Sequence, residues 1–366
     1  MASSKPANCF GPFDHHSSGV SIIEELITDD DSVIQVPQNY VIPDQESPIS
    51  DGTNLATIPT IDMTQLVLRN QSANNPELEK LHSACKEWGI FQLVNHGVSS
   101  ALLDKVKQEL EDFFKLPLEE KMRYKVRPGD VLVEGYGTVV KSEDQKLDWG
   151  NRLFMFTNPI YRRKSHLFPE LPISLRNALE SYMLELQRTA RTLLGLIGKL
   201  LKMKMEEMEE LFEDGLQSVR MTHYPPCPKP ELVVGLKPHS DGSGITILHQ
   251  VNGVQGLQIK KDGVWFPVSF DHEAFVVNIG DILEILSDGV YKSIEHRVTV
   301  NSEKERISIA MFFLPKVDAE IGPVTALSDA DQKPPSSGKI GMEKFLEKFF
   351  AHNLNGKTPL ERMTTN

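Results

Sequence analysis

The chain has 366 residues, of which 40% are hydrophobic and 25% are charged, as is ordinary for a globular protein with a sizeable core. Fifty-one acidic residues outweigh 39 basic ones and give a formal charge of −12, which argues against a nucleic-acid-binding surface. The three scattered cysteines and the lack of any apolar run of about 18 residues predict a reduced, cytoplasmic protein without disulfides or a membrane span.

The first 57 residues are expected to form a partly flexible arm. They begin without the apolar stretch of a signal peptide, and they carry an acidic run and several prolines. One short amphipathic helix is predicted near residues 21–27. An N-terminal α/β region is then predicted over residues 58–173. Its expected elements are a strand at 58–62, a helix at 76–88, a strand at 89–94 and a helix at 100–114.

The clearest helix is predicted from Ser174, a suitable N-cap residue, to about residue 202, because apolar residues recur there at spacings of three and four. A second helix is expected at 205–212, and residues 174–214 are interpreted as packing helices that face the core. A C-terminal helix near 342–350 and a polar tail are expected within residues 317–366.

Between these helical parts, residues 215–316 have the texture of an all-β domain. Short apolar or alternating runs are separated by turn signals such as Asn252-Gly253 and Asp262-Gly263. Many short strands at this spacing are typical of a sandwich or barrel. The runs lie at 217–224, 231–236, 244–249, 255–260, 264–268, 274–279, 281–287, 294–300 and 306–313.

A candidate metal site lies in this β region. His239 and Asp241 are two residues apart on extended backbone, so their side chains point to the same side. His296, on a distant strand, is the candidate third ligand. Two histidines and one carboxylate with open positions suit iron(II) oxygenases, although the same donors could hold zinc in a hydrolase. The neighbouring His223 is interpreted as structural.

A candidate carboxylate anchor follows ten residues after His296. Residues 298–305 are predicted to form a hairpin that places Arg306 and Ser308 on one face of a strand next to that of His296. An arginine fork beside a hydroxyl suits a bound carboxylate. Ala310 and Phe312 continue the same face. They are candidates for the substrate pocket, while the alternative for Phe312 is a plain core phenylalanine.

At these residues the chain resembles the plant 2-oxoglutarate/iron(II)-dependent dioxygenases, a family related to isopenicillin N synthase. The resemblance covers roughly residues 55–355. Its motifs are Ile58-Pro-Thr-Ile-Asp62, the stretch from Ala84 to Gly97, Tyr224-Pro-Pro-Cys-Pro228, Pro238-His-Ser-Asp241, Glu295-His-Arg297 and Arg306-Ile-Ser308. Residues 134–149 resemble one subgroup, which contains senescence-related oxygenases, thebaine and codeine O-demethylases and the strigolactone-pathway lateral branching oxidoreductase.

The resemblance implies an α+β fold with a distorted double-stranded β-helix (jelly-roll) core, flanking helices and the N-terminal α/β region. It implies that His239, Asp241 and His296 hold Fe(II), that Arg306 and Ser308 bind the distal carboxylate of 2-oxoglutarate, and that Tyr224 contacts it. Thr222 stands where the family commonly has an asparagine near this co-substrate.

The implied reaction consumes O2 and 2-oxoglutarate, with ascorbate as a supporting reductant, and releases succinate and CO2. It would hydroxylate or oxidatively O-demethylate a small plant specialised metabolite. The protein is expected to act as a monomer, without nucleic-acid or membrane partners.

Four alternatives remain open from the sequence. An ascorbate-type oxidase of the same superfamily would not release succinate from 2-oxoglutarate. A zinc hydrolase would act without O2. A catalytically silent small-molecule binding protein would be expected to have lost a metal ligand. A scaffold protein that uses the acidic arm would lose its role on deletion of residues 1–50.

Overall fold

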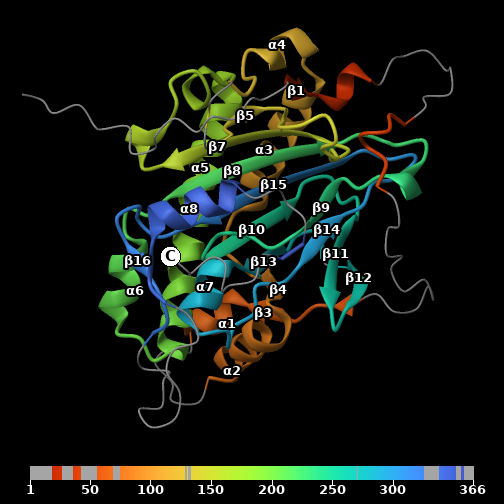
Figure 1. Cartoon of the computed structure of the whole chain (residues 1–366). Coiled ribbons are helices and arrows are strands. Elements are labelled where there is room, and N and C mark those ends of the chain that lie inside the picture. The colour runs from red at the N-terminus through yellow and green to blue at the C-terminus, as the bar shows by residue number, and fades with distance from the viewer. Residues whose placement is uncertain are drawn as a thin grey trace, which may run out of the picture.

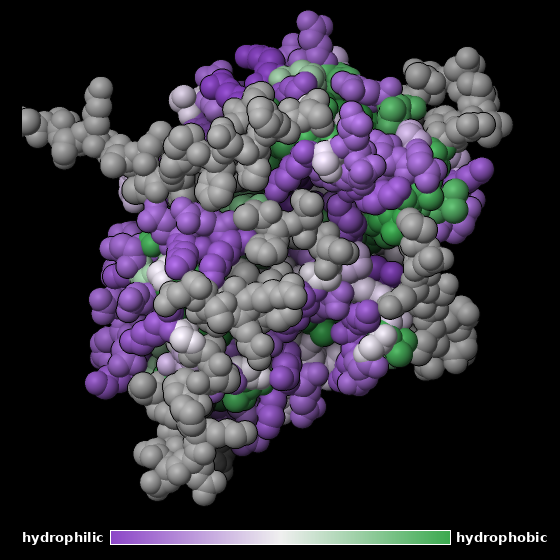
Figure 2. Space-filling model, in the orientation of Figure 1, coloured by the Kyte–Doolittle hydropathy of each residue, from purple (hydrophilic) through white to green (hydrophobic). Residues whose placement is uncertain are grey.

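The computed structural model describes residues 19–26, 36–42, 56–68, 75–127, 130, 133–269, 271–324, 338–351 and 356–357. Two β-sheets form the centre of the molecule, and helices pack around the larger one (Figure 1). Figure 2 shows that the described surface on this face is mostly hydrophilic, in keeping with the acidic composition. No helix among these residues combines the length and the apolar character needed to cross a membrane.

The larger sheet has eight strands in the order β3-β4-β13-β10-β15-β8-β7-β5. Its pairs are antiparallel except for β3 with β4. Its strands are β3 (Thr60–Asp62), β4 (Ile90–Val94), β5 (Gly135–Tyr136), β7 (Asn151–Asn158), β8 (Gln217–Tyr224), β10 (Ile245–Gln250), β13 (Phe275–Ile279) and β15 (Arg306–Phe313).

The smaller sheet faces the larger one and has the order β2-β12-β11-β14-β9. Its strands are β2 (Ala56–Thr57), β9 (Leu236–His239), β11 (Leu257–Lys261), β12 (Val264–Ser269) and β14 (His296–Val298). From β8 to β15 the chain alternates between the two sheets, except at the β11–β12 hairpin. This alternation is the winding of a jelly roll, so the predicted fold class is confirmed. Two further pairs are β1 (Gly19–Ser21) with β6 (Thr138–Val140), and β16 (Glu320–Ile321) with β17 (Ile340–Gly341).

Helices cover the outer face of the larger sheet. The main core joins apolar residues of α3 and α5 to the outward-facing residues of β8, β10, β13 and β15. The helices are α1 (Met63–Leu68), α2 (Pro76–Ser83), α3 (Ser100–Lys115), α4 (Leu118–Met122), α5 (Ile173–Leu200), α6 (Met205–Phe212), α7 (Asp281–Leu286) and α8 (Met342–Ala351). The π-turn η2 (Ala84–Trp88) extends α2, and short 3-10 turns are η1 (Ile23–Glu25), η3 (Ile160–Arg162), η4 (Phe168–Glu170) and η5 (Pro230–Leu232).

Successive side chains of β15 point to opposite faces of the sheet, so the residues that pack in the core alternate with those that line the site. The apolar set joins the helical core: Ile307, Ile309, Met311 and Phe313. The other set lines a cavity between the two sheets: Arg306, Ser308, Ala310 and Phe312. The inner face of the larger sheet is therefore the polar, site-bearing face.

Some predicted elements differ from the structure. The run at 281–287 is predicted as a strand, but Asp281–Leu286 form α7, all of whose residues are buried. A short apolar run that is buried on every side has no periodicity to separate a helix from a strand. The run at 231–236 contains η5, and β9 begins only at Leu236. Helix α5 begins at Ile173 with Pro172 at the N-cap, so Ser174 is not its cap.

The predicted hairpin at residues 298–305 is wrong. Strand β14 pairs with β9 and β11 in the smaller sheet, whereas β15 pairs with β8 and β10 in the larger one. Residues 299–305 therefore cross between sheets instead of turning back within one. Arg306 consequently faces His296 across the inter-sheet cavity and is not on an adjacent strand.

The described parts of the N-terminal arm, residues 19–26 and 36–42, pack against the rest of the chain. The helix predicted near 21–27 is absent from residues 21–26, which contribute the end of β1 and the single turn η1. Ile22 and Ile23 are both buried but belong to two different apolar clusters. The apolar face of a single amphipathic helix would instead pack against one cluster. Tyr40 packs edge-on against Trp149, with ring centroids 5.6 Å apart. The predicted polar tail lies almost wholly outside the described residues.

The boundaries of the predicted domains stay a prediction. The larger sheet takes β3, β4, β5 and β7 from the predicted N-terminal region and its other strands from the predicted jelly-roll region. The two regions are thus joined by a continuous ladder of backbone hydrogen bonds.

We expect Gly89→Ala to lower stability more than Gly97→Ala. Both glycines have a left-handed φ, +67° and +82°, which costs another residue about 1–2 kcal/mol. A Cβ at Gly89 would also overlap the carbonyl of Lys292, whereas a Cβ at Gly97 would meet no atom within 4 Å. Urea unfolding of both variants measures the difference. Equal losses of unfolding free energy in the two variants would show that the backbone around Lys292 shifts to accept the added Cβ at no cost.

Candidate active site

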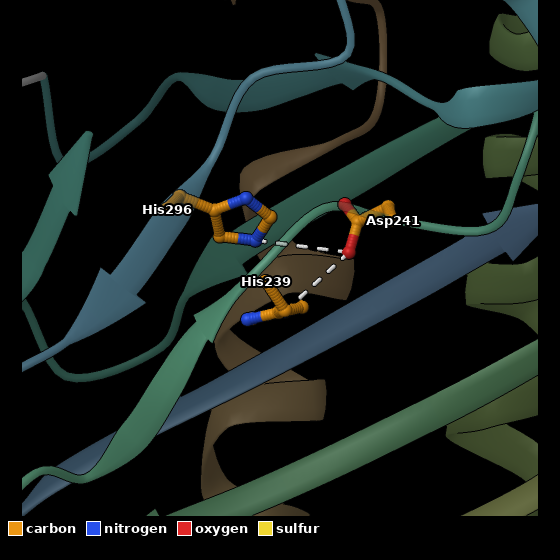
Figure 3. A group of neighbouring side chains, drawn as sticks. All are labelled: His239, Asp241 and His296. Atoms are coloured by element: carbon orange, nitrogen blue, oxygen red, sulfur yellow. Dashed lines mark ion pairs between the residues drawn. The ribbon is translucent and has the colours of Figure 1, made fainter. Parts of the chain in front are cut away.

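Three buried side chains converge where β9 and β14 meet. His239 ends β9 and pairs in register with His296 at the start of β14, while Asp241 lies just beyond β9. Asp241 Oδ1 is 3.6 Å from His239 Nε2 and 3.7 Å from His296 Nε2. Figure 3 shows the three side chains pointing toward one another. Their ligand atoms all lie within 4.8 Å of one another, and no other such group occurs among the described residues.

Backbone contacts orient both imidazoles. The Nδ1 atoms of His239 and His296 lie 2.8 and 3.1 Å from the carbonyls of Lys237 and Ile294. A protonated Nδ1 donates to each carbonyl and leaves Nε2 with a free lone pair directed at the shared space. Asn278 Nδ2 donates to Asp241 Oδ2 at 3.1 Å, so Oδ1 stays directed toward the imidazoles.

The protonation states also suit a metal ion. Burial, together with the neighbouring His296, lowers the pKa of His239 to about 3, so this imidazole is neutral at pH 7. Burial alone would raise the pKa of Asp241, but His296 and His239 outweigh it, so the net pKa lies below its ordinary value. Two imidazoles and one carboxylate form the facial donor set of non-haem iron(II), and the residues fit the ion.

A buried arginine lies across the cavity from these ligands. Arg306 is 2% exposed; its Nη1 donates to Ser308 Oγ at 3.2 Å and its Nη2 to Gln250 Oε1 at 3.5 Å. Its guanidinium carbon lies 5.2 Å from the ring centroid of Tyr224. Its buried Nε has no partner. A buried cation with an unused donor fits a carboxylate, because burying either charge alone is costly.

One cavity connects the two ends. It is lined by the three converging side chains and by Arg306, Ser308, Tyr224, Thr222, Ala310 and Phe312. Thr222 lies opposite Ser308 in the β8–β15 register. His223 points elsewhere: its Nε2 is 2.8 Å from Glu305 Oε2 and its ring stacks on Phe114, which supports the structural interpretation.

A second, more open pocket of about 200 Å³ shares His239, Asp241 and Phe312 with this cavity. Helix α8, drawn in blue in Figure 1, contributes Leu346, Phe349 and Phe350 to its wall. Phe154 on β7 faces Phe312 edge-on, with centroids 6.5 Å apart. The pocket therefore brings an apolar surface up to the converging ligands.

The sequence prediction did not include several residues of this site. Gln250 and Asn278 hold Arg306 and Asp241, and their roles depend on strand register. Arg152 and Arg220 line the open pocket. Arg220 had a usable signal, because it shares the strand phase of Thr222 and Tyr224 and therefore their face. His15 and His16 lie outside the described residues.

Phe312 borders both cavities and is also partly buried against the main core, so we expect Phe312→Leu to change the product pattern and to lower the melting temperature less than the control does. Phe313→Leu is the matched control. Phe313 is 4% exposed and lies on the opposite face of β15, in the helical core. Its truncation should lower stability by about 0.5–3 kcal/mol and leave the product pattern unchanged. Mass-spectrometric profiling and thermal unfolding separate the two. A Phe312→Leu variant that only loses stability would place this ring in the core.

The jelly roll and its converging donors define a non-haem iron(II) oxygenase. Residues 215–315 match the model of the 2OG-Fe(II) oxygenase superfamily, and residues 58–171 match that of the non-haem dioxygenase in morphine synthesis N-terminal region. The chain belongs to the 2OG-Fe(II) oxygenase superfamily and is a 2-oxoglutarate- and iron(II)-dependent dioxygenase, an oxidoreductase that acts on a small molecule.

Its relatives match over most of their length. Protein SRG1 of Arabidopsis thaliana is 46% identical, covering 94% of this chain and 96% of the relative. Codeine O-demethylase of Papaver somniferum is 45% identical, covering 91% of this chain and 93% of the relative. A crystal structure of JOX2 in complex with 2OG, Fe, and JA has a TM-score of 0.83 at 32% identity, covering 95% of this chain and 98% of that one.

Proposed function

We propose that this dioxygenase hydroxylates or oxidatively O-demethylates a small plant specialised metabolite held in the pocket beside His239 and Asp241. The observation that carries the proposal is a pair of cavities with shared lining residues, one that ends at Arg306 and one that is lined by aromatic rings. The names of relatives, among them codeine O-demethylase and a flavonoid 7-O-demethylase, support demethylation as one outcome.

The geometry of the two cavities supports the following proposed roles. His239, His296 and Asp241 hold Fe(II), which when bound activates O2 as 2-oxoglutarate is decarboxylated to succinate and CO2. Arg306 and Ser308 grip the distal carboxylate of 2-oxoglutarate, Tyr224 packs against the guanidinium, and Thr222 borders the co-substrate.

The remaining pocket walls orient the substrate. Phe312, Ala310 and the rings of α8 hold its apolar part and keep water from the reacting carbon. Hydroxylation of a methyl carbon next to an ether oxygen gives a hemiacetal, which breaks down to the demethylated alcohol and formaldehyde. The same site geometry therefore serves both hydroxylation and demethylation.

We further propose that the protein acts as a cytoplasmic monomer without nucleic-acid or membrane partners, with ascorbate as a supporting reductant. The site residues all come from one chain, so the site needs no second copy. Cys85 and Cys227 are free and buried, as suits a reducing compartment. Light scattering after size-exclusion chromatography tests the oligomeric state.

The test is incubation of the protein with a plant extract, Fe(II), ascorbate and 2-oxoglutarate. We expect succinate to form in an amount that matches the metabolites consumed, and formaldehyde to appear if methyl groups are removed. Oxidation without succinate would favour an ascorbate-type oxidase. Turnover without O2 would favour a hydrolase.

A further inference from the structure

Two arginines, Arg152 and Arg220, lie on the inner face of the larger sheet. Arg152 on β7 lies opposite Thr222, and Arg220 on β8 lies opposite Phe154. This register places both guanidinium groups on one face, two residues apart along neighbouring strands. Among the described residues, neither guanidinium forms a hydrogen bond or an ion pair with a carboxylate, and the buried Arg220 Nε has no partner. The guanidinium carbon of Arg152 lies 5.9 Å from the ring centroid of Phe154.

The charges around the open pocket do not balance. Lys237 Nζ lies 4.0 Å from Asp148 Oδ1, and Lys141 Nζ donates to the carbonyl of Phe350 at 3.2 Å. Asp241 faces the two metal-site imidazoles. The charge of Asp148 also acts on Arg152, but it is outweighed by burial and by Arg220, so the arginine pair carries the excess positive charge of the lining. The charged lining residues are Lys141, Arg152, Arg220, Lys237, Asp148 and Asp241.

Two neighbouring cations in a partly buried site repel each other. Burial, and after it the charge of Arg220, lowers the pKa of Arg152 to about 9, although the charge of Asp148 acts in the opposite direction. Removing unpaired charges from water is costly, and an anion placed between them would replace this repulsion with charge-assisted hydrogen bonds. The pair thus has the electrostatics of a binding site for an anion.

The position of Arg152 indicates which anion. Arg152 lines the open pocket but not the inner cavity that holds Arg306, whereas Arg220 borders both. The co-substrate's distal carboxylate has its own proposed partner in Arg306. The rings of Phe154, Phe312 and Phe349 line the open pocket next to the arginines. A ligand for this pocket would therefore combine an apolar body with one planar anionic group.

We propose that Arg152 and Arg220 form a subsite for a carboxylate carried by the oxidised substrate, which is an apolar monocarboxylic acid. The guanidinium fork matches a carboxylate in a bidentate geometry. This inference rests on the proposed function, because the subsite selects a substrate only if the adjoining metal site oxidises it.

The test compares 2-naphthylacetate with the nearly isosteric neutral 2-naphthylacetamide. Each is titrated by calorimetry into the full chain loaded with Fe(II) and 2-oxoglutarate under nitrogen. We expect the acid to bind at least tenfold more tightly than the amide. Arg152→Gln and Arg220→Gln should each reduce this ratio to below threefold. Phe349→Leu, a change in the same pocket without a change of charge, should weaken both ligands by a similar factor and preserve the ratio.

Several results would overturn the subsite. These are equal affinity for acid and amide in the native protein, no binding of the acid at millimolar concentration, or a preference that survives both arginine substitutions. A tenfold loss of 2-oxoglutarate affinity in Arg220→Gln with the acid preference intact would assign that arginine to the co-substrate instead. Succinate formation by the native protein is measured separately. Its absence alongside an intact acid preference would refute the proposed function and leave the carboxylate site standing.

Discussion

Replacing either His239 or Asp241 with alanine is expected to reduce succinate formation to background. Both residues supply a donor atom to the space shared with His296, and two remaining donors hold a divalent ion far less well than three. The fold should persist, because neither side chain belongs to the apolar clusters. Succinate formation, bound iron per chain and thermal unfolding measure the three consequences.

Ser240→Ala is the control from within the same tripeptide. The Ser240 hydroxyl donates to Asp281 Oδ2 at 3.2 Å and does not belong to the converging group. This variant should keep its iron. Full activity in His239→Ala or Asp241→Ala, or turnover of the native protein in a strong chelator, would refute the metal assignment.

The sequence predicted best what depends on local backbone geometry. His239 and Asp241 could be placed together because two residues of one extended segment must point to one side. The inner face of β15 followed from the same rule, since Arg306, Ser308, Ala310 and Phe312 alternate with core residues.

Long-range pairing was the part that the sequence did not determine. The polar sequence at 299–305 is compatible both with a turn back within one sheet and with a crossing to the other sheet. Arg152 reaches the pocket only because β7 pairs with β8 in one particular register. The contacts of Gln250 with Arg306 and of Asn278 with Asp241 depend on pairing of the same kind.

The crossing changes how the anchor works. On an adjacent strand Arg306 would lie beside His296; across the cavity it faces the metal ligands with room for a molecule between. A dicarboxylate that chelates the metal at one end can therefore reach the arginine with its other end. This geometry makes the contribution of Arg306 separable from that of the metal ligands.

Arg306→Leu is accordingly expected to weaken 2-oxoglutarate binding by roughly ten- to a hundredfold. A charge-assisted contact contributes about 1.5–3 kcal/mol, and each tenfold change in affinity corresponds to about 1.4 kcal/mol. Without 2-oxoglutarate, the variant should be no less stable than the native protein, because replacing a buried, incompletely paired cation with an apolar residue is often neutral or stabilising. Iron binding should also hold, because Arg306 is outside the donor group.

Two independent measurements of 2-oxoglutarate affinity test this prediction. The dependence of succinate formation on 2-oxoglutarate concentration gives the affinity change in turnover. The rise in melting temperature on adding 2-oxoglutarate, which follows from binding to the folded state alone, should shrink in parallel. Ser308→Ala removes one hydroxyl and keeps the charge, so its effect should be smaller than that of Arg306→Leu. An unchanged 2-oxoglutarate dependence in Arg306→Leu would mean that the distal carboxylate is bound elsewhere in the cavity.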